Sequence, residues 1–130
     1  MTATVGVVLV SHSAELARGL AALLGALGTG AVTVEVAGGT DDGGLGSSYA
    51  LIEQAVERAN GGAGVVVLAD LGSSVLTARM VLEDCADHSV VLVDAPFVEG
   101  AVSAKATAEA GADLATVVAA AEEARGFHKL

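Results

Sequence analysis

Aromatic side chains are nearly absent from this chain of 130 residues, which contains one Tyr, two Phe and no Trp. Since 53% of the residues are nevertheless hydrophobic, the core must be built from Val, Leu and Ala, whose small side chains favour closely packed layers of helix on sheet. This length supports one hydrophobic core and is too short for two ordinary domains. We therefore predict a single domain over residues 1–130.

Basic residues are also scarce. Six Lys and Arg stand against sixteen Asp and Glu, which gives a formal net charge of −10 at pH 7. Nucleic acids and anionic membranes both require clustered Lys and Arg, so we expect this chain to bind neither of them. A protein partner with a basic contact surface fits the charge better.

Only one cysteine is present, Cys85, which excludes an internal disulfide and a cysteine-based metal cluster and favours a cytoplasmic location. The two histidines that follow it, His88 and His128, fall in a predicted turn and in the C-terminal tail, and we expect no metal site. No apolar run approaches the roughly 20 residues that span a bilayer, and no basic stretch precedes the first run. Neither a membrane span nor a targeting segment is therefore predicted.

Nucleotide-binding motifs are missing as well. The pattern G-x-x-x-x-G-K-[ST] does not occur, and the segment from Gly44 to Gly46 lacks both the third glycine and the preceding strand of a dinucleotide fingerprint. We therefore expect no bound cofactor in this chain.

Short apolar runs that alternate with amphipathic segments give the main fold signal. Strands are predicted at Val5–Val10, Ala31–Val36, Gly64–Leu68 and Val90–Val93. Helices are predicted at about 14–27, 49–59, 73–85, 98–110 and 114–125. The alternation predicts an α/β fold, a three-layer α/β/α sandwich around a mainly parallel four-stranded sheet in the order 2-1-3-4.

Three segments carry more specific expectations. The leucines at 16, 20, 23, 24 and 27 fall on one helical stripe, with Ser13 or Ser11 as the N-cap of that helix. The helix at 73–85 is apolar on most sides, so it is either deeply packed or meets a second subunit. The glycine-rich loop at 37–48 is long for a connection in an ordered domain, and such loops usually have a functional role.

A histidine and an aspartate follow two of the predicted strands. His12 comes directly after the first strand and Asp70 directly after the third, and these strands are neighbours in the order 2-1-3-4. In open α/β sheets, ligands bind in the crevice at this carboxyl edge. A carboxylate that accepts from one imidazole nitrogen fixes the tautomer and leaves the other nitrogen free to attack. If the attacked group is a phosphoryl group, the same carboxylate stabilises the cationic ring that forms.

Hydroxyls and backbone amides near this crevice suit an anion. Predicted helices begin just after His12 and just after Gly72, and helix N-termini present free N–H groups. The glycines that leave the second strand allow amides to approach a phosphate closely. The candidate phosphate-binding residues are Ser13, Gly38, Gly39, Ser73 and Ser74.

At these residues the sequence resembles a known family. The matching pieces are V-L-V-S-H-S-A-E-L-A-R-G-L at 8–20, A-G-G-T-D-D at 37–42, L-G-S-S at 45–48, V-L-A-D-L-G-S-S at 67–74 and D-A-P-F-V-E-G at 94–100. They are similar to the DhaM phosphotransferase subunits of phosphoenolpyruvate-dependent dihydroxyacetone kinases, which are related to the mannose-type IIA domains of the sugar phosphotransferase system. The histidine in the first piece, His12, is shared with all mannose-type IIA domains, whereas the D-L-G-S-S stretch at 70–74 and the A-P-F-V-E-G stretch at 95–100 are typical of the dihydroxyacetone branch.

This resemblance implies a phosphohistidine carrier. His12 would be the phosphorylated residue, through its Nε2, and Asp70 the partner carboxylate. The carrier protein HPr would donate the phosphoryl group, and ADP held in the subunit DhaL would accept it, so that dihydroxyacetone on the subunit DhaK becomes phosphorylated. The family is homodimeric, and this chain resembles its single-domain form.

Two other functions stay open on the sequence. A mannose-type IIA domain would use the same chemistry but would pass the phosphoryl group to a IIB domain of a sugar transporter. A regulatory or interaction module on the same fold would bind a partner or an anion in the crevice without catalysis.

Overall fold

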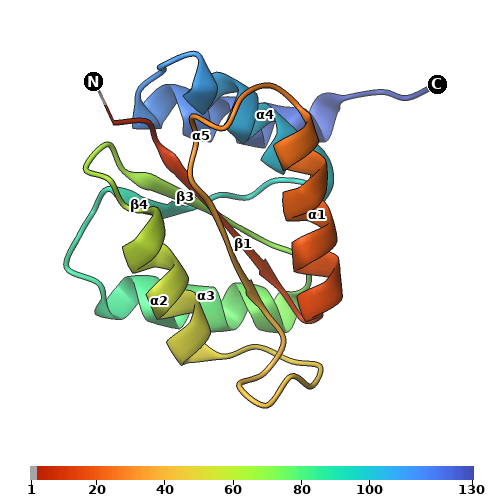
Figure 1. The fold of residues 1–130 in the computed structure, drawn as a ribbon, viewed down its shortest axis with the longest axis vertical. Helices are drawn as coiled ribbons and strands as arrows, with labels where there is room; N and C mark the ends of the chain where they lie inside the picture. Colours follow the sequence, from red (N-terminus) through yellow and green to blue (C-terminus); the bar gives the residue numbers. More distant parts are fainter. Residues whose placement is uncertain (1–2) are drawn as a thin grey trace.

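Four short parallel strands form the middle layer of the molecule (Figure 1). They are β1 (Gly6–Ser11), β2 (Val34–Gly38), β3 (Val65–Ala69) and β4 (Val90–Leu92). The structure, a computed structural model, describes residues 3–130. Its sheet has the order β2-β1-β3-β4, which confirms the predicted order and the α/β fold class.

Helices cover both faces of this sheet (Figure 1). They are α1 (Ala14–Ala26), α2 (Tyr49–Ala59), α3 (Gly72–Asp84), α4 (Phe97–Glu109) and α5 (Leu114–Glu123), followed by a 3₁₀ turn at Ala124–Gly126. One core cluster joins the sheet to α1, α4 and α5, and a second joins it to α2 and α3. The predicted three-layer sandwich is therefore confirmed.

Strand β1 is buried along its whole length and supplies both cores. Val7 and Leu9 belong to the cluster under α1, α4 and α5, whereas Val8 and Val10 belong to the cluster under α2 and α3. This alternation follows from the two-residue period of a strand. Because β1 lies in the centre, whatever follows Ser11 emerges between two neighbouring strands at the carboxyl edge.

Strand β2 lies further along the chain than the sequence predicted. It pairs with β1 from Val34 to Gly38, whereas the prediction was Ala31–Val36. A Cβ on Gly38 would lie 2.6 Å from the Cα of Ala14, so glycine is needed where the end of β2 passes the start of α1.

The leucine stripe of α1 was predicted too wide. Leu20 and Leu24 are buried in the core, but Leu16, Leu23 and Leu27 are 44–48% exposed. A helix packed on one sheet face buries a narrow stripe, here Ala17, Leu20 and Leu24 at spacings of three and four.

Helix α3 is not deeply packed within this chain. Its buried residues are small or medium in size, namely Ser74, Ala78 and Val81. The larger Leu76 and Met80 are 60% and 56% exposed. Of the two interpretations of this helix, deep packing is therefore wrong for the single chain.

Across residues 3–130, none of the helices has the length and apolar character that crossing a bilayer requires.

Candidate functional site

The ends of β1 and β3 bring His12 and Asp70 together. In the parallel register Val10 lies opposite Ala69, so the next residues on the two strands leave the sheet at the same level. His12 Nδ1 lies 3.0 Å from Asp70 Oδ1. The backbone N–H of His12 also donates to Asp70 Oδ2 at 3.2 Å, so the carboxylate holds both the backbone and the ring.

The Asp70 carboxylate is almost surrounded by donors. Ser11 Oγ donates to Oδ2 at 2.7 Å, and the N–H of Leu71 donates to Oδ1 at 2.6 Å. Burial raises the pKa of Asp70, but the hydrogen bonds from Ser11, His12, Leu71 and Ser74 together outweigh it and lower that pKa to about 2. Asp70 is therefore ionised at neutral pH and can only accept hydrogen bonds.

An ionised Asp70 decides the tautomer of His12. Since the carboxylate has no proton to give, the proton between Oδ1 and Nδ1 belongs to the ring. Nε2 therefore carries the lone pair, and the hydroxyl of Ser73 donates to it. The side chain of His12 is 25% exposed, so part of the ring is open to the outside.

Ser11 is a site residue that the sequence did not single out. It is fully buried, accepts from the N–H of Ser13 at 3.0 Å and donates to Asp70. In the sequence it was considered only as a helix cap, a role that Ser13 fills instead. A serine as the last residue of a buried apolar strand was the available signal, because a hydroxyl there needs a partner.

The five candidate phosphate-binding residues have different surroundings. Ser13 Oγ accepts from the N–H of Leu16 and caps α1. The N–H of Gly39 donates to the carbonyl oxygen of Ser11, and the close approach of Gly38 to α1 is described above. Ser73 lies on the Nε2 side of the ring, whereas Ser74 is buried with its hydroxyl 3.0 Å from Nδ1.

The first turn of α3 lacks the cap that α1 has. Its N-cap residue is Leu71, whose side chain makes no capping hydrogen bond, so no side chain satisfies the first N–H groups of this helix. Ser73, in the same turn, touches Nε2. The positive end of a helix dipole thus lies beside Nε2 of His12.

The glycine-rich loop at 39–48 also belongs to the site. The N–H of Gly46 donates to the carbonyl oxygen of His12 at 3.0 Å, and the Ser47 hydroxyl lies 3.0 Å from that of Ser74. The sequence predicted a functional role for this loop but named only Gly38 and Gly39 at its start. Ser47 could not be found from the sequence, since its partner Ser74 is 27 positions away.

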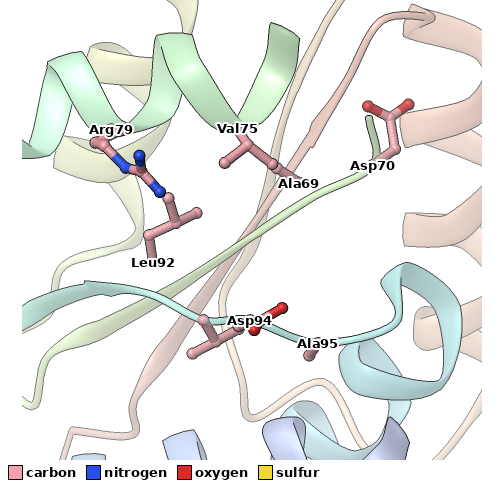
Figure 2. Close-up of a pocket in the computed structure, with 8 residues that line it drawn as sticks. Ala69, Asp70, Val75, Arg79, Leu92, Asp94 and Ala95 are labelled. Atoms are coloured by element: carbon pink, nitrogen blue, oxygen red, sulfur yellow. The ribbon is translucent and has the colours of Figure 1, made fainter. Parts of the chain in front are cut away.

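A crevice of about 410 Å³ opens next to this site, between the ends of β3 and β4 (Figure 2). Asp70 forms part of its wall, and Arg79 and Asp94 bring charges to it. His88 and His128 are exposed. In residues 3–130 no three or more His, Cys, Asp or Glu side chains gather closely enough to hold a metal ion.

Comparison with known families gives one match over most of the chain. The model of the family described as "PTS system fructose IIA component" matches residues 6–118.

Curated relatives have similar sequences. The phosphotransferase subunit DhaM of the PTS-dependent dihydroxyacetone kinase of Lactococcus lactis is 34% identical over 109 residues, which cover 84% of this chain and 86% of that protein. The phosphoryl donor subunit DhaM of dihydroxyacetone kinase 1 of Listeria innocua is 34% identical over 78% of this chain and 79% of its own length. In the DhaM subunit of Escherichia coli the match, at 33% identity, spans 25% of a longer protein.

Solved structures share the fold. The crystal structure of EF1359, a protein described as of unknown function, has a TM-score of 0.79 and 33% identity, with 92% of this chain and 93% of that one covered. The dihydroxyacetone kinase of C. freundii has a TM-score of 0.64 at 19% identity over 91% of this chain and 24% of that one, which shows a common fold only.

Proposed function

This chain belongs to the family of PTS system fructose IIA components, and on that premise we propose that it carries a phosphoryl group on His12 for a dihydroxyacetone kinase. The relatives from Lactococcus and Listeria are named as DhaM subunits of such kinases. In the proposed sequence of steps, phospho-HPr is the donor, ADP bound in DhaL is the acceptor and DhaK is the subunit that holds dihydroxyacetone. All of these steps would take place in the cytoplasm.

One observation carries the proposal, namely the contact of Nδ1 with the ionised Asp70 in a His12 side chain that is 25% exposed. An imidazole held in this way has its lone pair on Nε2. It is therefore a nucleophile that a partner protein can reach.

In the proposed chemistry His12 acts on the phosphoryl group directly, and Asp70 acts through the His12 ring. The Nε2 lone pair attacks the phosphorus of the donor's phosphohistidine, the donor's P–N bond breaks, and its electron pair leaves with the donor's imidazole. The ring of His12 then carries a positive charge, which Asp70 stabilises through Nδ1–H. In the second step an oxygen of the terminal phosphate of ADP attacks the same phosphorus, and the electron pair of the P–Nε2 bond returns to His12.

We assign the phosphoryl oxygens mainly to the first turn of α3. Ser73 has to turn its proton away from Nε2 before attack, after which the hydroxyl can donate to a phosphoryl oxygen. The N–H groups of that turn, which no side chain caps, supply further donors. Ser13 Oγ accepts a hydrogen bond as the cap of α1, so its own proton is free to be donated to a phosphoryl oxygen. Gly38 and Gly39, at the end of β2, pass close to the start of α1 and would bring their backbone to the same group.

Partner proteins would meet an apolar and acidic surface around His12. Leu45 precedes Gly46, whose N–H donates to the carbonyl oxygen of His12, and the N–H of Leu71 donates to Asp70. The two leucines are 82% and 63% exposed. Asp41 and Asp42 lie exposed in the same loop as Leu45. A donor with apolar contacts inside a basic rim fits this surface, as the net charge of −10 also suggests.

The second copy of a homodimer would pack on α3. Leu76 and Met80 form an exposed apolar pair one turn apart on this helix, which leaves a face without a partner in the single chain. Replacing Met80 by Asp should give a monomer in multi-angle light scattering if this face forms the dimer. A dimer that survives the change would place the interface elsewhere.

Phosphoryl transfer from phosphoenolpyruvate through enzyme I and HPr tests the proposal. We expect acid-labile phosphate on the wild-type chain and none on His12→Ala, with His88→Ala as the matched control that is phosphorylated normally. Absence of label on the wild type would favour the regulatory or interaction module instead.

The acceptor decides between the two phosphocarrier functions. We expect DhaL loaded with ADP to remove the label from His12, and a mannose-type IIB domain to leave it in place. The opposite result would assign the chain to sugar transport.

A further inference from the structure

The loop between β2 and α2 is closed upon itself and held in one shape. The N–H of Thr40 donates to the carbonyl oxygen of Gly44, and the N–H of Gly43 donates back to the carbonyl oxygen of Thr40, both at 3.0 Å. Gly46 has a φ of +137°, which only glycine adopts readily, and a Cβ there would lie 2.8 Å from Thr40. The hydrogen bonds within the loop and the φ of Gly46 thus fix the course of the backbone into Ser47.

This geometry brings two groups of the loop to His12. The N–H of Gly46 holds the carbonyl oxygen of His12, and the next residue, Ser47, hydrogen-bonds to Ser74 with an Oγ–Oγ distance of 3.0 Å. Ser74 in turn lies 3.0 Å from Nδ1 of the ring. Ser74 is completely buried, so protein groups must satisfy its hydroxyl.

The chemistry of a hydroxyl fixes what Ser74 can do. Because Nδ1 carries a proton that it donates to Asp70, it has no lone pair, and Ser74 Oγ can only accept from it. The single proton of Ser74 must then be directed to Ser47 or to the Asp70 carboxylate. A Ser74 hydroxyl that turned its proton towards Nδ1 would favour the other tautomer, in which Nε2 has no lone pair.

We propose that Ser47 is a positioning residue that acts through Ser74 to keep the imidazole of His12 in the Nδ1–H tautomer. The hydrogen bond between the two hydroxyls holds the Ser74 side chain in one rotamer, with its lone pair towards Nδ1. The inference deepens the proposed function and gives the glycine-rich loop a role in it. Asp70 and Ser74 then both accept from the same ring atom, Nδ1.

The neighbouring Ser48 provides a matched control. Its hydroxyl accepts from the N–H of Leu51, caps α2 and donates to Asp41, so it supports the loop and the helix without contacting Ser47 or Ser74 through its side chain. Loss of this cap should cost stability alone. A purely structural role for the loop would make Ser47→Ala and Ser48→Ala behave alike.

The test is the ¹⁵N spectrum of the His12 ring, which distinguishes the two tautomers in the unphosphorylated protein. We expect Ser47→Ala and Ser74→Ala each to lower the population of the Nδ1–H tautomer, Ser47→Thr to restore it, and Ser48→Ala to leave it unchanged while lowering Tm. The double variant Ser47→Ala/Ser74→Ala should equal Ser74→Ala, since Ser47 acts only through Ser74.

A Ser47→Ala spectrum identical to that of the wild type, or additive effects in the double variant, would overturn the proposal. The measurement involves no donor or acceptor protein, so its outcome is independent of whether His12 carries phosphate for a kinase. If the proposed function also holds, the rate of His12 phosphorylation should fall about three- to tenfold in Ser47→Ala and recover in Ser47→Thr.

Discussion

Helices α1 and α3 both begin where a central strand ends, yet the two helix starts are built differently. At α1 the Ser13 hydroxyl accepts from the N–H of Leu16, and the carbonyl oxygen of Ser13 accepts from Ala17. At α3 the N-cap residue is Leu71, which has the extended backbone of a cap but no capping side chain. The start of α1 is capped by the side chain of Ser13, whereas the start of α3 has no side-chain cap and lies beside Nε2 of His12.

The difference separates stability from proposed function at one edge of the sheet. A cap of the Ser13 kind contributes about 1 kcal/mol to folding. Leaving it out at α3 forgoes that contribution and keeps N–H groups free for an anion. The serines of the α3 turn are bonded to the ring of His12 instead of to their own helix.

Loss of the Asp70 charge should have the largest effect. In Asp70→Asn we expect phosphorylation of His12 to slow by about 10²–10³-fold with the fold intact, because the neutral amide neither fixes the tautomer nor stabilises the cationic ring. Initial rates with phospho-HPr measure this. Asp84→Asn, on the exposed side of α3, is the control that should keep the wild-type rate; unchanged rates in Asp70→Asn would contradict the assigned role.

Acid should remove a stability contribution from the same carboxylate. The pKa of Asp70 is lowered from an ordinary 3.8 to about 2 in the folded chain, so its contribution is complete above pH 4 and is lost as the pH falls towards 2. We expect the difference in unfolding free energy between wild type and Asp70→Asn to shrink by about 2 kcal/mol over this range. Urea titrations at pH 5, 4, 3 and 2 measure it, and a constant difference would show that the donors around Asp70 do not depress its pKa.

Removing the Ser73 hydroxyl should affect transfer more than folding. We expect Ser73→Ala to slow phosphorylation about tenfold, since the proposed charge-assisted hydrogen bond to the phosphoryl group would be lost, and to leave Tm nearly unchanged because Ser73 is exposed. Ser103→Ala on α4 serves as a control for the loss of a hydroxyl. A large fall in Tm of Ser73→Ala with a normal phosphorylation rate would contradict this assignment, because it would give the start of α3 a role in stability and not in phosphoryl binding.

Removing the Ser13 hydroxyl should show the opposite balance. Ser13→Ala is expected to lower the unfolding free energy by about 1 kcal/mol through loss of the α1 cap, and to slow phosphorylation less than Ser73→Ala does. Thermal unfolding and transfer rates on the same preparations decide this. The comparison fails if Ser13→Ala is phosphorylated more slowly than Ser73→Ala and is the more stable protein of the two.

Adding the missing cap to α3 should have the smallest effect on stability, but stability and phosphorylation rate should change in opposite directions. Leu71 already has cap geometry, with φ −116° and ψ 170°, so Leu71→Ser should raise the unfolding free energy by about 0.5 kcal/mol while slowing phosphorylation. Leu71→Ala, which removes the leucine without adding a cap, separates the new hydrogen bond from the lost apolar contact. A faster Leu71→Ser variant would show that the open helix end is not used.

Much of this architecture could be predicted from the sequence because it rests on local patterns. The buried runs, the cap at Ser13 and the alternation of strands and helices follow from periodicity and side-chain chemistry close in the chain. The boundaries of β2 and the exposure of Leu16, Leu23 and Leu27 did not follow, since pairing register and helix rotation depend on neighbours far along the chain.

The site divides in the same way. The sequence by itself determined that a histidine and an aspartate leave two buried strands at one edge of a parallel sheet, because strand composition and chain order fix that much. Only the tertiary structure decided how the two are held. The donors and acceptors around them, Ser11, Ser47, Ser73 and Ser74, come from three segments that meet in space, and a hydroxyl's role depends on which partners lie within about 3 Å of it, which no local pattern encodes.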